Sequence, residues 1–339
     1  MDHSHSDDDA PGAGAAIPII DLSRPDRHQL AQDVRHACEH VGFFYLEGHG
    51  MEPEFLKQVF EQSKQLFRLD VNEKTALSDK IMSRGYTAFR EETLDPERQT
   101  SGDTKEGYYI GVEVSETDPR YDPAKLRGPN QWPSQELLPK FQSTMTEYHA
   151  RASKLGIQVA QIMALALELD DEHYFDQYFT DVPLATLRLL HYAKEESRPE
   201  DGIFACGAHS DYGFITLLLT DEHPGLQIYH KEVWMDVPSR PNAFVVNIGD
   251  MLERWTNGLF VSTKHRVLTS GDYERYSIPF FFEPTFETIV QCLESCCSES
   301  NPPKYPSITS GQHLLNKYAE THADFEPADT NEKSKNSQS

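Results

Sequence analysis

Apolar residues recur along the chain with two different spacings. Residues 27–40 and 53–67 carry apolar side chains three and four positions apart, and residues 141–169 continue the same spacing for longer. Such spacing places the apolar side chains on one face of a helix. We therefore predict two amphipathic helices early in the chain, followed by one long helix that acts as a structural spine.

Short apolar strands flank the first helix and then replace the helical pattern. We predict strands at residues 17–22 and 41–46, and a long Gly-, Pro-, Asp- and Thr-rich loop region at residues 83–133, which is typical of a functional segment. Several short strands separated by turns indicate a β-sandwich or barrel in the second half. These strands are predicted at residues 186–192, 214–219, 226–229, 233–237, 243–248 and 276–282.

The composition is that of a globular protein with an acidic balance. The chain has 339 residues, enough for one large domain or two smaller ones, and a formal net charge of -24 from 55 acidic and 31 basic residues. This charge disfavours nonspecific binding to nucleic acid or anionic membranes. No run of about 18 apolar residues is present, and an odd number of cysteines favours a reducing compartment. We predict a cytoplasmic protein without a nucleic-acid or membrane partner.

Three residues have the side chains of an iron site. His209 and Asp211 lie two positions apart at a predicted strand, where both would point to the same side. His265 would lie at the start of another strand and complete the set of ligands. Two imidazoles and one carboxylate on one face of an ion are the ligand set of non-haem Fe(II) oxygenases.

The pattern His-x-Asp is a weak signal when it stands alone. It also occurs at His5/Asp7 and at His322/Asp324, in polar segments without a predicted scaffold. Only His209/Asp211 lies at an apolar strand, so we select it as the candidate metal site.

Several ordered motifs resemble the isopenicillin N synthase-like 2-oxoglutarate- and Fe(II)-dependent dioxygenases, over residues 17–322. In chain order the motifs are Ile17-Pro-Ile-Ile-Asp-Leu22, Gly42-Phe-Phe-Tyr-Leu-Glu-Gly-His49-Gly50, His209-x-Asp211, Asn247-Ile-Gly-Asp250, Trp255-x-Asn257-Gly258, Ser262-x-x-His265-Arg-Val267 and Arg275-x-Ser277. The resemblance implies a mainly β fold with flanking helices (α+β), in which a double-stranded β-helix (jelly-roll) core follows a helical N-terminal region.

The same resemblance implies a division of the chain into segments. We expect disordered tails at both ends, an N-terminal dioxygenase region of helices and substrate loops, a spine helix, and a jelly-roll catalytic core. The corresponding residues are 1–16 and 323–339 for the tails, then 17–133, 134–182 and 183–322 for the three folded segments.

The resemblance also assigns roles to individual residues. It makes His209, Asp211 and His265 the iron ligands, and it places Arg275 and Ser277 on the distal carboxylate of 2-oxoglutarate. The planar guanidinium of arginine matches a carboxylate bidentately. Tyr192 stands where related enzymes contact the cosubstrate, although many plant members have Asn two positions earlier, where this chain has Leu190. An ordinary core tyrosine is the alternative for Tyr192. Asn247 and Asp250 are candidates for orienting the imidazoles.

The expected reaction is oxidation of a small metabolite by O2, with Fe(II) as cofactor, ascorbate as an optional reductant, and release of succinate and CO2. We expect the protein to act as a monomer or weak homo-oligomer. The substrate is predicted to be an amino acid, guanidino compound or other nitrogen-bearing molecule paired with a glutamate. Candidate substrate contacts are Arg84, Tyr86, Glu106, Tyr212 and Phe281, with Glu91 and Glu92 interpreted individually as surface residues.

Three other functions use parts of the same pattern. One is an iron oxidase of the same fold that does not consume 2-oxoglutarate, and another is a non-catalytic barrel that binds a metal or an organic acid. A third is hydrolytic zinc chemistry, in which Arg275 and Ser277 would have no role. Succinate formed per O2 consumed separates the first alternative from a 2-oxoglutarate-dependent enzyme.

Overall fold

Two sheets of unequal size form the centre of the computed structural model, which describes residues 17–321. The larger has nine strands in the order β1-β2-β11-β8-β13-β6-β5-β4-β3, and the smaller has four in the order β10-β9-β12-β7. The predicted tails, His5/Asp7 and His322/Asp324 lie outside the described residues. The larger sheet comprises β1 (Ile19–Asp21), β2 (Phe43–Glu47), β3 (Ser78–Asp79), β4 (Arg84–Thr87), β5 (Lys105–Ile110), β6 (Thr186–Tyr192), β8 (Ile215–Thr220), β11 (Phe244–Ile248) and β13 (Arg275–Phe282).

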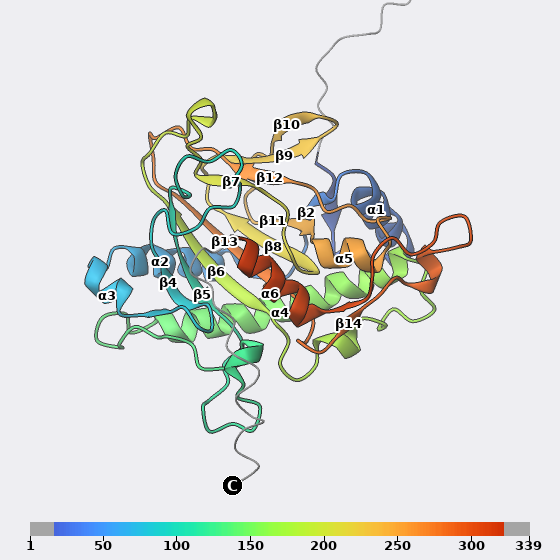
Figure 1. Cartoon of the computed structure of the whole chain (residues 1–339), viewed down its shortest axis with the longest axis horizontal. Coiled ribbons are helices and arrows are strands. Elements are labelled where there is room, and N and C mark those ends of the chain that lie inside the picture. The colour runs from blue at the N-terminus through green and yellow to red at the C-terminus, as the bar shows by residue number, and fades with distance from the viewer. Residues whose placement is uncertain (1–16, 322–339) are drawn as a thin grey trace, which may run out of the picture.

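The smaller sheet lies above the larger one in Figure 1 and contains β7 (Cys206–His209), β9 (Leu226–His230), β10 (Val233–Asp236) and β12 (His265–Val267). All its pairings are antiparallel. In the larger sheet only β1 and β2 run parallel. A separate pair consists of β14 (Ile289–Val290) and β15 (Ile308–Thr309).

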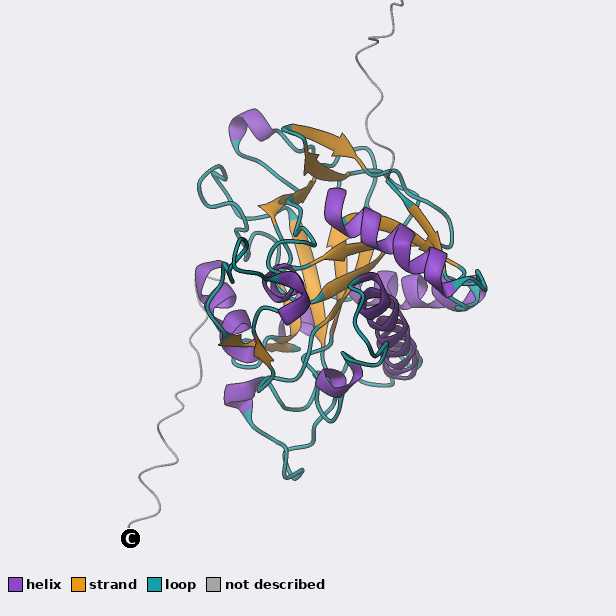
Figure 2. Cartoon of the chain, turned by 90° about the vertical axis from the view of Figure 1, so that its right-hand side faces the viewer, coloured by secondary structure: helices purple, strands orange, loops and turns teal. Residues whose placement is uncertain are grey.

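The helices cover the strands from outside, as Figures 1 and 2 show. They are α1 (Arg27–His40), α2 (Pro53–Phe67), α3 (Val71–Thr75), α4 (Phe141–Ala166), α5 (Asp250–Trp255) and α6 (Ser310–Thr321). The long helix α4 runs beneath the larger sheet, with α1 and α2 packed against it. Its apolar face is buried, including Tyr148, Leu155 and Val159. This burial supplies a major part of the apolar core that supports the sheet.

The structure confirms the two early helices, the spine helix and the predicted strands to within a few residues at their ends. The interpretation of residues 83–133 as a loop region was wrong in part, because β4 and β5 add two strands to the larger sheet. Every residue of β5 is buried. Helix α6 was not predicted, and the strand predicted at His209 and Asp211 is β7, which ends at His209.

The first part of the chain is built into the same sheet as the second. Strand β2 pairs with β11, and β5 pairs with β6. Strands from both sides of residue 133 thus belong to one sheet. The predicted division of the chain into segments stays a prediction. Within residues 17–321, no helix combines the length and apolarity that a membrane crossing requires.

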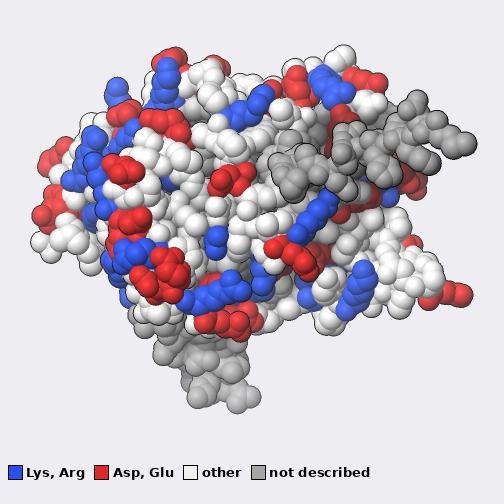
Figure 3. Space-filling model, turned by 90° about the horizontal axis from the view of Figure 1, so that it is seen from above, with Lys and Arg blue, Asp and Glu red and all other residues white. Residues whose placement is uncertain are grey.

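Basic and acidic side chains are interspersed on the face shown in Figure 3. Many surface charges form ion pairs, such as Arg90 with Glu195 at 2.6 Å and Arg127 with Glu287 at 2.6 Å. Charges of both signs therefore lie close together on this face. Exposed pairs of this kind add little to stability.

Candidate metal centre and adjoining pockets

The two candidate histidines sit opposite each other on neighbouring strands of the smaller sheet. His209 is the last residue of β7, His265 is the first residue of β12, and the two are direct partners in the ladder. Their ring centroids are 4.3 Å apart. Asp211 lies in the loop after β7, so our prediction that it shares a strand with His209 was wrong. The loop nevertheless turns its carboxylate back toward both rings.

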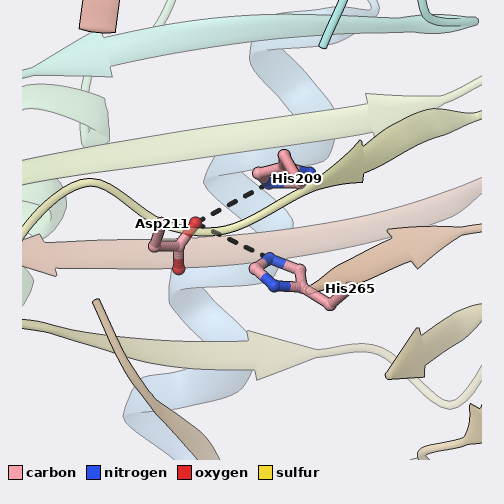
Figure 4. A group of neighbouring side chains, drawn as sticks. All are labelled: His209, Asp211 and His265. Carbon is pink, nitrogen blue, oxygen red and sulfur yellow. Dashed lines mark ion pairs between the residues drawn. The ribbon is translucent and has the colours of Figure 1, made fainter. Parts of the chain in front are cut away.

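The three side chains converge on one point (Figure 4). Nε2 of His209 and Nε2 of His265 each lie 3.6 Å from Oδ1 of Asp211. One ligand atom from each residue lies within 4.8 Å of the others. A single metal ion bound by these atoms would keep its opposite side open to small molecules.

Surrounding hydrogen bonds orient each of these side chains. Nδ1 of His209 lies 2.9 Å from the carbonyl oxygen of Gly207, and Nδ1 of His265 lies 3.3 Å from that of Thr263. A nitrogen that donates to a carbonyl carries the proton, which leaves Nε2 of each ring free for a metal.

The carboxylate of Asp211 is held through one of its two oxygens. Oδ2 accepts a hydrogen bond of 2.7 Å from Nδ2 of Asn247 and another from the Thr216 hydroxyl. Oδ1 remains directed at the imidazoles. The predicted role of Asn247 and Asp250 in orienting the imidazoles was wrong, because Asn247 binds Asp211 and Asp250 accepts from Ser262 at 2.8 Å.

Electrostatics favour the protonation states that bind metals. Burial and the neighbouring His209 lower the pKa of His265 to about 4. Burial alone would raise the pKa of Asp211, but the two imidazoles and the hydrogen bonds from Thr216 and Asn247 outweigh it and lower that pKa. Neutral imidazole and ionised carboxylate are the metal-binding forms of these groups.

A cavity extends from this cluster to a buried arginine. Arg275 is 1% exposed, and its Nε and Nη1 atoms have no hydrogen-bond partner among the described residues. The Tyr192 ring lies 4.9 Å from its Cζ, and the Ser277 hydroxyl is 3.4 Å from the Tyr192 hydroxyl. Burying an unpaired cation is costly, so this arrangement fits an anion that enters the cavity and accepts hydrogen bonds from Arg275.

A second cavity adjoins the first beside His209 and Asp211. Tyr212 and Phe281 line it, in the position expected of aromatic walls. Helix α6 adds Leu314 and Tyr318 to its lining. An organic molecule in this cavity would therefore lie beside the metal cluster.

Glu106 and Tyr86, which we predicted as substrate contacts, lie outside the linings of both cavities. Side chains alternate along β5, so Lys105 and Tyr109 face the cavities whereas Glu106 faces the opposite side of the sheet. There the Glu106 carboxylate binds Lys74 at 2.7 Å, the Tyr86 hydroxyl at 2.6 Å and His191 at 2.7 Å. These residues form a buried structural cluster.

Arg84, another predicted substrate contact, also lies outside the cavity linings. Its guanidinium donates to the backbone carbonyls of Met82 at 3.1 Å and Leu126 at 2.9 Å. It therefore joins β4 to a neighbouring turn.

A buried charged network between the cavities was not predicted from the sequence. Glu92, which we interpreted as a surface residue, is 4% exposed. It pairs with Arg188 at 2.6 Å and Lys105 at 3.0 Å, and it accepts a hydrogen bond of 2.8 Å from the Tyr109 hydroxyl. Alternation along β6 could have identified Arg188, which shares a face with Tyr192.

Glu283 is the other cavity residue that the sequence patterns did not predict. It follows β13, lines the second cavity, and is 4% exposed. Burial, with a smaller contribution from the Asp211 carboxylate, raises the pKa of Glu283 to about 8. The sequence could have indicated Glu283, because it stands two residues after Phe281 and side chains at this spacing on a strand face the same side.

Comparisons with known proteins give a consistent result. Residues 17–135 match the family described as non-haem dioxygenase in morphine synthesis N-terminal, and residues 185–284 match the 2OG-Fe(II) oxygenase superfamily. The chain is 36% identical to kihadalactone A synthase LFS of Citrus sinensis over 323 residues, which covers 92% of this chain and 95% of that protein.

Two fungal proteins are similarly related. The chain is 37% identical to the 2-oxoglutarate-Fe(II) type oxidoreductase hxnY of Emericella nidulans, with 91% of each chain covered. A full-length Neurospora crassa protein, crystallised with alpha-KG and thymine, superposes with a TM-score of 0.78 at 31% identity, covering 90% of this chain and 96% of that one.

Proposed function

Because the chain belongs to the isopenicillin N synthase-like family of 2-oxoglutarate- and Fe(II)-dependent dioxygenases, we propose that its two adjoining cavities bind the cosubstrate and a small nitrogen-bearing substrate. The protein is an oxidoreductase with a double-stranded β-helix core that uses Fe(II), 2-oxoglutarate and O2. The observation that carries the proposal is the buried guanidinium of Arg275, whose Nε and Nη1 lack hydrogen-bond partners among residues 17–321, in a cavity that reaches the His/Asp/His cluster.

His209, Asp211 and His265 are the proposed ligands of Fe(II). Their fit rests on the two free Nε2 atoms and on the carboxylate oxygen that Thr216 and Asn247 leave unengaged. Bound Fe(II) supplies the chemistry by which O2 decarboxylates 2-oxoglutarate to succinate and CO2 and oxidises the substrate. The protein residues position the ligands and keep water from the buried side of the site.

Arg275 and Ser277 are proposed to bind the distal carboxylate of 2-oxoglutarate, with Tyr192 beside them. Arg275 offers N–H groups that have no partner within residues 17–321. The Ser277 and Tyr192 hydroxyls lie 3.4 Å apart and could donate to the same anion. A buried cation in the cavity wall would fix the position of the distal carboxylate of the bound dicarboxylate.

The second cavity is proposed to receive the substrate, between Tyr212 and Phe281. The Neurospora relative was crystallised with thymine, a nitrogen-bearing ring, which supports a nitrogen-bearing molecule as substrate here. The other relatives carry different names, so the individual compound differs among them. Neither the oxidase that spares 2-oxoglutarate nor the non-catalytic barrel is favoured.

The proposal also includes the setting in which the protein acts. The acidic net charge of -24 supports a free small molecule as partner, without nucleic acid or membrane, for a monomer or weak homo-oligomer. All five cysteines are free thiols, which supports a reducing, cytoplasmic compartment.

An anaerobic titration with Fe(II) and then 2-oxoglutarate tests this function. We expect a visible metal-to-ligand absorption band that is abolished in His209→Ala, and succinate release when O2 is admitted. Arg275→Leu should weaken 2-oxoglutarate binding about 30-fold or more, because it removes hydrogen bonds to a charged group.

Arg198→Leu is the matched control, since Arg198 is exposed and pairs only with Asp201 at the surface among the described residues. Equal 2-oxoglutarate affinity in both arginine variants would contradict the role of Arg275. Oxygen uptake without succinate would contradict the function itself.

A further inference from the structure

We propose that Glu283 is the polar anchor of the substrate cavity and that the substrate presents an N–H donor on a flat ring to this carboxyl group. The inference rests on the proposed function and names the chemical class that the same site selects. Glu283 is distinct from the iron ligands and from the residues assigned to 2-oxoglutarate.

The first support is a buried carboxyl group that lacks a protein partner. Glu283 is 4% exposed, yet it has no hydrogen bond or ion pair with any residue in the range 17–321. Other carboxylates buried to this extent do have partners: Glu92 binds Arg188, Glu106 binds Lys74 and Asp103 binds Lys105. The Glu283 carboxyl group instead lines the cavity, where a ligand donor would supply a hydrogen bond that no residue in the range 17–321 supplies.

The second support is the direction of the side chain. Arg275, Ser277 and Phe281 alternate along β13 toward the cavities, and Glu283 continues that alternation. The carboxyl group therefore lines the substrate cavity beside Asp211 and His209. A substrate bound to it would lie next to the proposed iron site.

Gly213 provides the space that this orientation requires. A Cβ atom at position 213 would lie 2.4 Å from both Cγ and Oε1 of Glu283. Any larger residue would therefore displace the carboxyl group. The loop between Asp211 and β8 therefore leaves room for the Glu283 side chain because position 213 is a glycine.

The cavity walls indicate the kind of molecule that carries the donor. Aromatic side chains line it at Tyr109, Tyr212, Phe281 and Tyr318, and such faces pack well against flat rings. The guanidinium of Arg188 is already paired with Glu92 and stacked 4.3 Å from the Tyr109 ring. The carbonyl oxygen of the Glu283 carboxyl group can accept a hydrogen bond from a ring N–H that lies between these walls.

Unfolding experiments separate a ligand-binding role from a structural one. Glu283→Met keeps an unbranched side chain of similar length and removes the carboxyl group. Without ligand, we expect its thermal midpoint to equal or exceed that of wild type, because an unpaired buried carboxyl is removed. A midpoint clearly below wild type would show that the carboxyl has a structural partner and would overturn the proposal.

Binding is then measured by calorimetry with three matched pairs of rings that differ in N–H groups. The pairs are thymine with 1,3-dimethylthymine, 2-pyridone with 1-methyl-2-pyridone, and indole with 1-methylindole. We expect wild type to prefer the N–H member of at least one pair by about tenfold or more, as expected for a hydrogen bond to a charged or buried group. Glu283→Met should reduce that preference to within about twofold.

Glu299→Met is the control, because Glu299 is exposed and outside both cavities, and it should keep the wild-type preference. A preference that survives in Glu283→Met would reflect the bulk of the methyl group, and the absence of any preference in wild type would show that no N–H is recognised. Either result overturns the inference. The Fe(II) and 2-oxoglutarate absorption band, recorded on the same wild-type sample, shows separately whether the proposed function holds.

Discussion

At the scale of single residues, the Asp211 carboxylate has two differently used oxygens. Thr216 and Asn247 hold Oδ2, while Oδ1 faces the two imidazoles. Hydrogen bonds of this kind fix a ligand before the metal arrives, which lowers the ordering cost of binding. Iron affinity should therefore depend on residues that never contact the ion.

Thr216→Val tests this dependence, since it keeps the shape of the side chain and removes the donor to Asp211. We expect Fe(II) affinity to fall about 10- to 100-fold, measured by anaerobic titration. Thr220→Val, on the same strand with its hydroxyl 3.4 Å from Ser239, should retain wild-type affinity. Equal affinity in both variants would mean that the Thr216 hydroxyl does not position the carboxylate.

Residue patterns in the sequence identified the residues of the candidate metal cluster better than they identified the residues that line the cavities. His209, Asp211 and His265 belong to spaced motifs, and the structure brings them together. The contrast between Glu92 and Glu106 could not be predicted, because both lie in a segment without clear periodicity. Which glutamate faces the cavity depends on the register of β5 and on how the preceding loop folds.

At the scale of elements, β5 separates two buried ionic clusters on its two faces. Lys105 faces the cavities, and Glu106 faces α3 and Lys74 on the other side. Burial opposes ionisation of Glu106, but hydrogen bonds from His191, Lys74 and Tyr86 outweigh it and lower its pKa below the ordinary 4.5. The ionised carboxylate therefore links β5 to α3 and β6.

Glu106→Gln should destabilise the protein at neutral pH by roughly 3 kcal/mol, because it leaves the buried Lys74 without its counterion. A group with a lowered folded-state pKa contributes stability that is present above its ordinary pKa of 4.5 and is lost as pH falls through the folded value. The difference between wild type and variant should hence shrink below about pH 4.5, as urea unfolding would show. A difference that grows on acidification would contradict this assignment.

The packing of α4 against β13 leads to another prediction at this scale. A Cβ atom at Gly156 would lie 2.6 Å from Cγ of the buried Phe282 ring. Gly156→Ala should gain about 1 kcal/mol in helix propensity yet lose more by overpacking, which typically costs about 1–3 kcal/mol.

We expect a net loss of stability for Gly156→Ala in denaturant unfolding. Lys154→Ala, at an exposed position on the same helix, should change stability by less than about 0.5 kcal/mol. Stabilisation by Gly156→Ala would show that the Phe282 ring can move. Periodicity predicted the helix, but only tertiary packing shows why a glycine occupies its centre.

At the scale of the whole molecule, both cavities are lined by residues far apart in the chain. Leu94, Arg188, His265 and Phe281 all contribute to the cavity that reaches Arg275. A ligand in this cavity binds only the folded protein, so it should raise the free energy of unfolding of the whole protein.

With the metal site filled, 2-oxoglutarate at about 100 times its Kd should add about 2.7 kcal/mol of stability. Anaerobic thermal unfolding with Fe(II) measures this increment. Arg275→Leu should keep the stabilisation by metal and lose most of the increment at the same 2-oxoglutarate concentration, and a chelator should remove both effects. An increment unaffected by the Arg275 substitution would place the cosubstrate elsewhere.

The direct pairing of His209 with His265 joins positions that are synthesised far apart in time. A chain emerging from the ribosome carries the first two candidate ligands well before it carries the third. Strand β12 must then insert between β7 and β9 before the imidazoles can meet. Nascent chains thus hold an incomplete set of ligands during most of translation, and tight iron capture becomes a late event that follows sheet closure.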